Sequence, residues 1–207
     1  MPRGAQLDCS SWRQYRNLMI DRRTFLAAAA VLPALRSERA VGASTMSRLS
    51  AYAFTFNALD GGQILLASYS GRPMMIVNTA SQCGYTPQYA GLQALWTRYR
   101  ERGLLMLGVP SNDFGGQEPG EAKEIHSTAE GEYHVTFPLT EKATVKGTNA
   151  HPFYRWAAAE RPLETPRWNF HKYLIGRDGS LKASFVSAIE PTGVKVVAAI
   201  EFELLAA

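Results

Sequence analysis

The sequence predicts an α/β fold, because a buried strand, a helix and a second buried strand follow one another. Residues 74–77 form a continuous apolar run, as expected for a strand that is buried on both faces. Over residues 87–102 large apolar side chains recur every three or four positions, and Gly103 suits the end of a helix. Residues 104–109 form the second apolar run. Two strands joined through a helix require a crossover connection, so we expect them to pair in parallel.

Further elements are predicted on both sides of this unit. Before it, aromatic residues at 52, 54 and 56 lead to Asp60-Gly61-Gly62, which predicts a strand pair with a hairpin-type turn. After it, residues 112–120 are too polar for core and too rich in glycine for a helix, which predicts a loop. The other predicted elements are a short helix to about residue 129, a candidate strand at 133–139, a helix at 151–159, a hairpin with strands at 168–175 and 181–186, and a closing helix at 191–205.

The first 43 residues are predicted to be an export signal. Residues 21–26 (DRRTFL) precede residues 27–35, an alanine-rich apolar stretch that is shorter than the ~20 residues needed to span a bilayer. This arrangement resembles a twin-arginine signal, which implies export of the folded protein to the periplasm. We therefore expect a signal peptide at 1–43, a single domain at 44–207 and no stable membrane insertion after cleavage. The alternative is an N-terminal helix that is never removed.

The positive charge of the chain lies in this leader. The whole chain carries a formal net charge of +4, whereas residues 44–207 contain 15 basic and 15 acidic residues. A neutral domain without clustered basic and aromatic residues gives no reason to expect a nucleic-acid partner. With 46% hydrophobic and 19% charged residues, the composition is that of one soluble domain with a full core.

One cysteine occupies a position that is suited to chemistry. Cys83 follows the first apolar run and lies four residues before Pro87, where a strand gives way to a helix. Free backbone N–H groups at such a turn can stabilise a thiolate and so lower the thiol pKa from its usual value of about 8.5. The alternative is a small buried hydrophobic residue, the common state of a free cysteine. The other cysteine, Cys9, lies in the predicted leader, so the mature domain would hold no partner for a disulfide.

Three blocks of sequence favour the reactive thiol. In order, they are residues 78–89 (NTASQCGYTPQY), residues 110–120 (PSNDFGGQEPG) and residues 168–170 (WNF). Together they resemble the glutathione peroxidase family, and the resemblance runs from Phe54 to Phe185. It implies a thioredoxin-like fold, with a central mixed sheet flanked by helices, and reduction of hydroperoxides by a cysteine that glutamine, tryptophan and asparagine assist. The positions that match this catalytic set are Cys83, Gln117, Trp168 and Asn169.

The chemistry of these four side chains fits that reaction. Amide and indole N–H groups are neutral donors, so they can stabilise a thiolate and orient a peroxide without adding a titrating group. In the implied cycle the Cys83 thiolate attacks the distal oxygen of hydrogen peroxide or an organic hydroperoxide, water or an alcohol leaves, and a sulfenic acid remains. We expect no cofactor and no metal, but a thiol co-substrate. Without the resemblance, Gln117 would be read as an ordinary polar loop residue, Trp168 as a core residue and Asn169 as a turn former.

Departures from the family pattern concern the reductant and the assembly. Many cysteine-dependent members carry a second, resolving cysteine, and alignment on residues 135–138 (VTFP) puts its place at about Ala129. A further cysteine found in relatives is here Ser111. The resemblance therefore implies a one-cysteine cycle, in which an external thiol such as glutathione or a thioredoxin-like protein regenerates the enzyme. The segment between Tyr154 and Trp168 lacks the insertion of tetrameric relatives, so we expect a monomer with a site open to bulky hydroperoxides.

Two functions without turnover remain as alternatives. A copper chaperone of the same fold would use a C-x-x-x-C pair and a distant histidine, but Pro87 occupies the place of the second cysteine. The histidines at 126, 134, 151 and 171 have no short ligand spacing, so no metal site is predicted. A redox sensor would instead pass oxidation of Cys83 to a partner. Sustained peroxide consumption with a thiol donor separates the enzyme from both alternatives.

Overall fold

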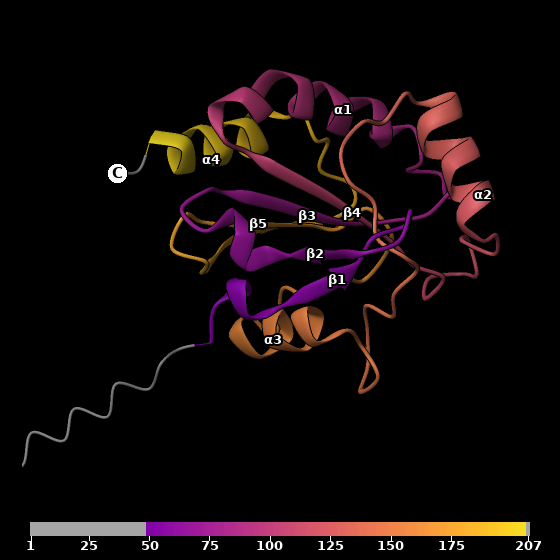
Figure 1. Ribbon diagram of the computed structural model, residues 1–207, viewed down its shortest axis with the longest axis horizontal. Helices are drawn as coiled ribbons and strands as arrows, with labels where there is room; N and C mark the ends of the chain where they lie inside the picture. Colours follow the sequence, from indigo (N-terminus) through magenta and orange to yellow (C-terminus); the bar gives the residue numbers. More distant parts are fainter. Residues whose placement is uncertain (1–48, 206–207) are drawn as a thin grey trace, which may run out of the picture. The chain divides into compact units, whose positions relative to one another are not determined.

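A computed structural model describes residues 49–205, and this part of the chain has the predicted α/β fold (Figure 1). Its strands and α-helices are β1 (Thr55–Asn57), β2 (Gln63–Leu65), β3 (Met74–Thr79), α1 (Gln88–Tyr99), β4 (Leu105–Pro110), α2 (Ala122–His126), α3 (Pro152–Glu160), β5 (Lys172–Ile175), β6 (Leu181–Phe185) and α4 (Val194–Leu205). None of the helices in this range is long and apolar enough to cross a membrane. The predicted export signal and its cleavage site before Ser44 lie outside the described residues.

The central sheet is mixed and has the strand order β4-β3-β5-β6. The predicted crossover is confirmed, because β3 and β4 pair in parallel with α1 between them in the chain. β5 pairs antiparallel with both β3 and β6, so the C-terminal hairpin completes the sheet. The predicted N-terminal hairpin is confirmed as well, since β1 and β2 form a separate antiparallel pair.

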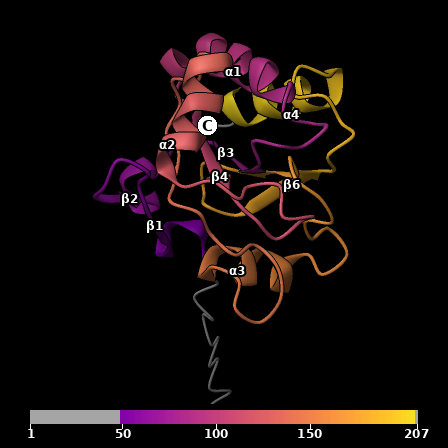
Figure 2. The same cartoon turned by 90° about the vertical axis from the view of Figure 1, so that its right-hand side faces the viewer.

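Helices cover the two faces of this sheet (Figures 1 and 2). α1 and α4 lie together on one face, and α3 lies on the other. Side chains of β3 pack into the core on both faces of the sheet, because successive side chains of a strand point to opposite faces. Met74 and Ile76 belong to the core cluster that includes the α3 side chains, whereas Met75 and Val77 belong to the cluster that includes those of α1 and α4. All six residues of β3 are buried, which explains its continuous apolar run.

The prediction of a strand at 133–139 is wrong. Its alternating burial resembles that of a strand, but its backbone N–H groups bond elsewhere: that of Val135 to a carbonyl of the preceding helical segment and that of Thr136 to a glutamine side chain of α1. His134 has φ of +53°, a left-handed conformation that a regular strand excludes. Within the described chain this segment reaches the sheet only through an isolated bridge at Leu139.

Smaller differences concern element ends. The short helix after the glycine-rich loop forms as α2 and continues as a π-helix at Ser127–Glu132. The strand expected at 168–175 begins only at Lys172, because Phe170 has φ of +63° and turns the chain before β5. The closing helix begins at Val194 instead of 191, after a turn.

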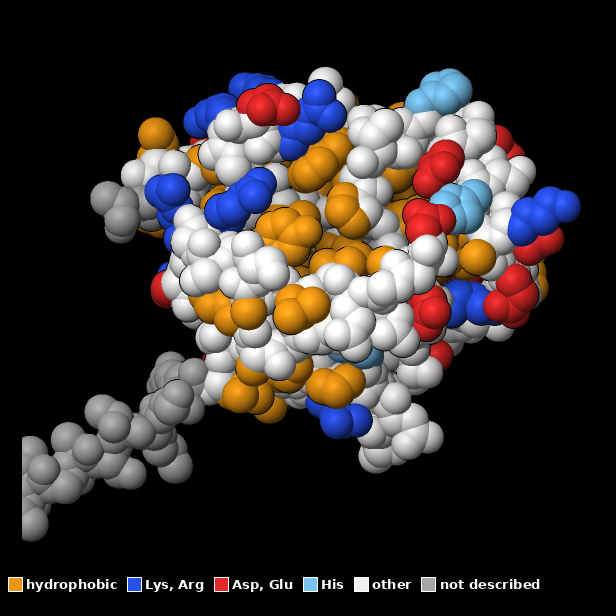
Figure 3. All heavy atoms as spheres, viewed as in Figure 1, with side chains coloured by type: hydrophobic (Ala, Val, Ile, Leu, Met, Phe, Trp, Pro, Cys, Tyr) orange, Lys and Arg blue, Asp and Glu red, His pale blue; other side chains and the backbone are white. Residues whose placement is uncertain are grey.

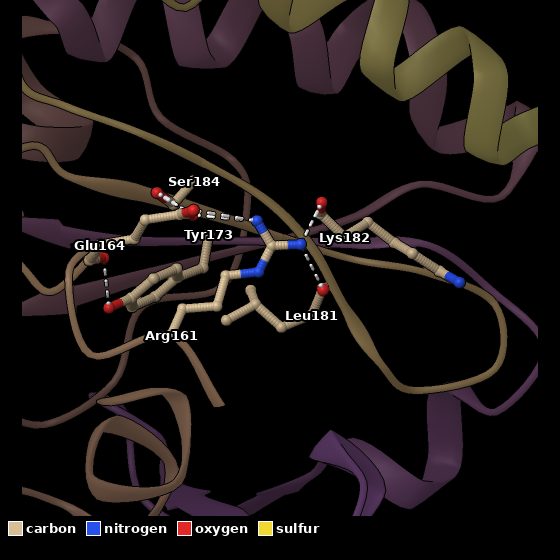
Figure 4. A network of polar contacts seen from close by, with 6 residues as sticks. All are labelled: Arg161, Glu164, Tyr173, Leu181, Lys182 and Ser184. Carbon is tan, nitrogen blue, oxygen red and sulfur yellow. Dashed lines mark hydrogen bonds and ion pairs between the residues drawn. The ribbon is translucent and has the colours of Figure 1, made fainter. Parts of the chain in front are cut away.

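A polar network fixes the loop that leads from α3 to β5 (Figure 4). Arg161 donates through Nη2 to the carbonyl oxygens of Leu181 (3.0 Å) and Lys182 (2.7 Å) in β6, and through Nη1 to the carboxylate of Glu164 (3.0 Å). The hydroxyl of Tyr173 in β5 donates to the Glu164 carbonyl at 3.0 Å. The first part of the loop, at Arg161 and Glu164, is therefore tied to the C-terminal hairpin.

Candidate active site

Cys83 lies in a tight turn that a threonine holds in shape. The Thr86 hydroxyl accepts a hydrogen bond from the Cys83 N–H (3.0 Å) and donates one to the carbonyl of Ala80 (2.8 Å). The Tyr85 N–H lies 3.4 Å from the Cys83 Sγ, so the backbone donor expected at this turn is present. The cysteine is only 7% exposed. Its side chain is therefore almost entirely enclosed by the protein.

The glycine-rich loop is attached to this turn by two hydrogen bonds. The Gln82 N–H donates to the backbone carbonyl of Gln117 at 3.0 Å, and the Ser81 N–H donates to the Glu118 carboxylate at 3.0 Å. Asn112 in turn accepts from the Glu118 N–H at 2.9 Å. Burial raises the pKa of Glu118, and the hydrogen bonds from Ser81 oppose that effect. These bonds place Gln117 in contact with Gln82, the residue that precedes Cys83.

Asn169, from the third sequence block, contacts the Gln117 side chain. Its Nδ2 donates to the Gln117 Oε1 at 2.9 Å and lies 3.4 Å from the carbonyl oxygen of Phe114. Asn169 is fully buried, and its Oδ1 has no hydrogen-bond partner among the described residues. Because the Gln117 oxygen is engaged in accepting, the amide NH₂ of Gln117 is the group left for a neighbouring thiolate or peroxide.

Trp168 forms an exposed wall of this region. It is 40% exposed, and its ring centroid lies 6.0 Å from that of Phe114. A methyl group built on Gly115 would lie 3.5 Å from both the Gln117 side chain and the Trp168 ring, so both side chains lie beside Gly115. The structure therefore gathers the turn of Cys83 with Gln117, Trp168 and Asn169. Their catalytic roles remain predictions.

Asn78 is a residue of the site region to which sequence reasoning gave no role. It lies near the end of β3, where its Nδ2 donates to the Trp168 carbonyl at 3.1 Å and its Oδ1 accepts from the His171 N–H at 3.1 Å. The backbone of Asn78 also accepts from the Phe170 N–H at 2.6 Å. The signal in the sequence is only that an amide follows an apolar run; in the structure Asn78 is fully buried and therefore needs such partners.

Two cavities border the thiol turn. One of about 440 Å³ begins at Tyr85 and Trp168 and is lined mainly by apolar surface. Its other lining residues are Arg167, His171, Val186, Ser187 and Ala188. The second, of about 530 Å³, lies between the turn and the α2 region and is lined by Ser81, Gln82, Glu118, Pro119, Gly120, Glu124, Ser127 and Thr128. The first cavity therefore offers mainly apolar surface, whereas the second offers a mixture of polar and apolar surface.

The face of the molecule drawn in Figure 3 has no single sign of charge. In Figure 3 basic side chains gather over the ends of α1 and α4, while acidic side chains and histidines gather over the side that carries α2. His126 of α2 pairs there with Asp60 (2.8 Å) and Glu130 (2.9 Å). Among residues 49–205 no group of three or more His, Cys, Asp or Glu side chains is placed to hold a metal ion.

The fold and the site define a thioredoxin-fold protein with a thiol at the turn before its first long helix. A solved structure of a thioredoxin-family thiol:disulfide interchange protein from Chlorobium tepidum has a TM-score of 0.58 at 14% identity, covering 76% of this chain and 97% of that one. At this identity the likeness concerns the fold alone. It confirms the predicted thioredoxin-like fold class.

The chain belongs to the glutathione peroxidase family, whose sequence model, described as "Glutathione peroxidase", matches residues 51–158. The hydroperoxy fatty acid reductase gpx1 of Synechocystis is 46% identical over 149 residues, which cover 68% of this chain and 88% of that protein. The glutathione peroxidase-like peroxiredoxin gpx1 of Schizosaccharomyces pombe is 41% identical over 135 residues, or 64% and 85% of the two chains. The crystal structure of T. cruzi GPX1 has a TM-score of 0.60 at 29% identity and covers 75% and 97%. The protein is therefore an oxidoreductase that acts on peroxide, as predicted.

Proposed function

We propose that this protein is a one-cysteine thiol peroxidase whose site consists of Cys83, Gln117, Trp168 and Asn169. The observation that carries the proposal is the double attachment of Gln117. Its backbone oxygen accepts from Gln82, the neighbour of Cys83, and its side-chain oxygen accepts from Asn169. Three segments that are distant in the sequence thereby meet at one thiol, with neutral donors beside it. Neither a copper site nor a sensor without turnover requires this arrangement.

In the proposed first step the Cys83 thiolate attacks the distal oxygen of the peroxide. The O–O bond breaks, an S–O bond forms, and the leaving oxygen takes up a proton and departs as water or alcohol. The sulfur is oxidised by two electrons and the peroxide is reduced by two. The Gln117 NH₂ group and the Trp168 indole N–H are the donors that would orient the peroxide and stabilise the charge on the departing oxygen.

Organic hydroperoxides with an apolar chain are the proposed preferred substrates. The 440 Å³ cavity beside Trp168 offers mainly apolar surface to such a chain, and the exposed Arg167 at its border suits a carboxylate. The similar Synechocystis protein is named for the reduction of hydroperoxy fatty acids. Hydrogen peroxide, which needs no such surface, is the proposed second substrate.

An external thiol is the proposed reductant, with no cofactor. It would displace water from the sulfenic acid to form a mixed disulfide, and a second thiol would release Cys83 as a disulfide forms between the two donors. Ala129, at the place of the resolving cysteine in relatives, is fully buried in the π-helix after α2, and Ser111 is fully buried after β4. Neither side chain can supply a thiol. Glutathione and a thioredoxin-like protein are the candidate donors.

The proposal places the enzyme in the periplasm as a monomer. Its support is the twin-arginine-like pattern at residues 21–26 and the short connection between α3 and Trp168. Expression of the full chain followed by fractionation would test the location: a protein that begins at Ser44 in the periplasm is expected, and an uncleaved cytoplasmic protein would contradict it. Sedimentation of the protein starting at Ser44 would test for a monomer.

The central experiment compares the protein starting at Ser44 with Cys83→Ser and with the surface control Ser180→Ala. Peroxide consumption with glutathione or a thioredoxin as donor should be lost in Cys83→Ser and retained in Ser180→Ala. A sulfenic acid reagent followed by mass spectrometry should label Cys83 after one equivalent of peroxide, and glutathione should then form a mixed disulfide there. Sustained turnover in Cys83→Ser would refute the proposal.

A further inference from the structure

Lys172, the first residue of β5, has a completely buried side chain. Its Nζ donates to the Gln88 Oε1 at 2.7 Å and to the carbonyl oxygens of Phe170 and Ile189, each at 2.8 Å. An ammonium group has three hydrogens, so these three acceptors satisfy it fully in its charged form. None of the three acceptors is charged. Burying an ammonium costs hydration free energy, which these three hydrogen bonds must offset.

Gln88, the first residue of α1, extends this link. Its Oε1 accepts from Lys172, while its Nε2 donates to the carbonyl oxygen of Ser187 at 2.8 Å and lies 3.4 Å from the Glu190 carboxylate. Both ends of the amide are therefore engaged, which fixes its orientation. The ammonium and the amide together join the start of α1 to the segment that follows β6.

The three segments joined in this way surround the proposed peroxidase site. Gln88 begins α1 five residues after Cys83. Phe170 directly follows Trp168 and Asn169, and its φ of +63° is unusual for a bulky residue, so its backbone must be held by its surroundings. Ser187 belongs to the wall of the 440 Å³ cavity that Trp168 also lines.

We propose that Lys172 is a positioning residue for the peroxidase site. Its ammonium holds the turn at 168–170 and the cavity wall at 186–189 in place against the start of α1. Lys172 does not touch the peroxide; it acts through Phe170 and Gln88, and this inference rests on the proposed function. A neutral amine has only two hydrogens and one lone pair, so deprotonation leaves one of the three acceptors without a partner and loosens the link.

The charged groups around Lys172 make this a pH-dependent link. Burial lowers the pKa of Lys172 to about 8, and the carboxylate of Glu190 acts in the opposite direction. His171, the preceding residue, has a pKa lowered to about 4 by burial and by the charge of Lys172, so it is neutral when the link is intact. From α1 the neutral Gln88 faces the ammonium. The link is therefore complete at neutral pH and weakens as the pH rises above about 8.

The test compares Lys172→Met with Lys182→Met. Lys182 lies on the neighbouring strand β6, pairs with Asp178 at 2.8 Å and serves as the matched control. In single-turnover oxidation of Cys83 by hydrogen peroxide at pH 7, the rate constant should fall at least ~10-fold in Lys172→Met and change less than about two-fold in the control. Alkylation of Cys83 by iodoacetamide, which needs only the thiolate, should change far less. A folded Lys172→Met protein with an unchanged peroxide rate would overturn the inference.

Lys172→Arg gives an independent readout, because a guanidinium remains charged throughout the accessible pH range. The wild-type peroxide rate should fall as the pH rises above about 8, and this fall should be absent in Lys172→Arg. An identical alkaline fall in both proteins would count against a role for the Lys172 charge.

Hydrogen exchange separates failure of this inference from failure of the proposed function. In the wild-type protein, protection of the amides at 168–170 and 186–190 should decrease between pH 7 and 9.5, after correction for intrinsic exchange, while that of β3 persists. This measurement needs neither peroxide turnover nor a stable variant. If wild-type protein does not react with peroxide but shows this local loss, the link exists and the proposed function is wrong. Equal protection at both pH values would refute the link itself.

Discussion

The side-chain NH₂ of Asn169 donates a 2.9 Å hydrogen bond to the side-chain oxygen of Gln117, across 52 positions of the sequence. This bond decides which end of the Gln117 amide accepts and which end donates. It turns two residues that could each serve as ordinary polar loop residues into one oriented donor beside the turn of Cys83. In the proposed site Asn169 positions Gln117, and because Asn169 is fully buried we expect this contact to be sensitive to substitution.

The Asn169→Asp substitution should reverse this orientation at almost constant volume. A carboxylate cannot donate to the Gln117 oxygen, so the amide of Gln117 is expected to turn its NH₂ toward Asp and away from the thiol. We expect the rate constant for oxidation of Cys83 by hydrogen peroxide to fall by about 10- to 100-fold. Stopped-flow measurement at pH 7 checks this, with the exposed Asn149→Asp as control. Equal rates in the two variants would show that the bond has no part in the reaction.

The Thr86→Val substitution should damage the turn of Cys83. Valine has nearly the same shape as threonine but lacks the hydroxyl that bridges the Cys83 N–H and the Ala80 carbonyl. Leaving these buried groups unpaired should cost about 2 kcal/mol of unfolding free energy. The matched variant Thr86→Ser retains the hydroxyl and should lose about half as much or less, since it removes only a methyl group. Urea denaturation measures both, and a Val variant as stable as the Ser variant would contradict the bridge.

His171 should make the stability of the domain depend on pH between about 4 and 6.5. Burial, followed by the charge of Lys172, lowers its folded pKa to about 4 from 6.5. The unfolded state therefore binds more protons in this interval, so the unfolding free energy falls as the pH falls through it, by up to about 3 kcal/mol. His171→Phe should flatten this part of the profile. Urea titrations at pH 7 and pH 4.5 provide the comparison, and parallel profiles would exclude the effect.

The Gly108→Ala substitution should destabilise the sheet edge at β4. A methyl group at this position would lie 2.5 Å from a Leu139 methyl and 3.2 Å from the Phe137 ring, which is closer than packed carbons approach. We expect a loss of about 1 to 3 kcal/mol, because the segment at 137–139 must move away from the strand. Gly84→Ala is the control, since nothing lies within 4 Å of its added methyl and its φ is not positive. Thermal unfolding should separate the two variants clearly.

The sheet and its helices can be predicted from the sequence because the patterns that indicate them lie within short segments. The apolar run at 74–77 and the periodicity of 87–102 identified β3 and α1, and the order strand-helix-strand required their parallel connection. For the segment at 133–139 the same kind of pattern gives a wrong prediction. Its buried and exposed residues alternate like those of a strand, but His134 is left-handed and the amides of Val135 and Thr136 bond to helices. Alternation records burial, whereas a strand also requires a partner for its backbone.

Only those residues of the site that lie in the three sequence blocks with a family resemblance were predicted. Cys83, Gln117 and Asn169 lie in blocks that resemble one family, and the structure brings them together. The contacts of Asn78 and Lys172 were not predictable, because buried amides and ammonium groups find partners through the tertiary fold. Their sequence signal is only that a polar residue stands at the boundary of an apolar strand.

The position of β3 between β4 and β5 has a consequence for biosynthesis. β4 follows β3 closely in the chain, whereas β5 pairs with β3 through residues about 100 positions later, such as Met74 with Ile175. A nascent chain therefore exposes the Cys83 segment well before Asn169 and Lys172 have left the ribosome, and the late long-range pairing slows completion of the sheet. Gln117 follows about 34 residues after Cys83, but Trp168 and Asn169 arrive only with the last fifth of the chain. The proposed site is therefore completed only when synthesis is nearly finished.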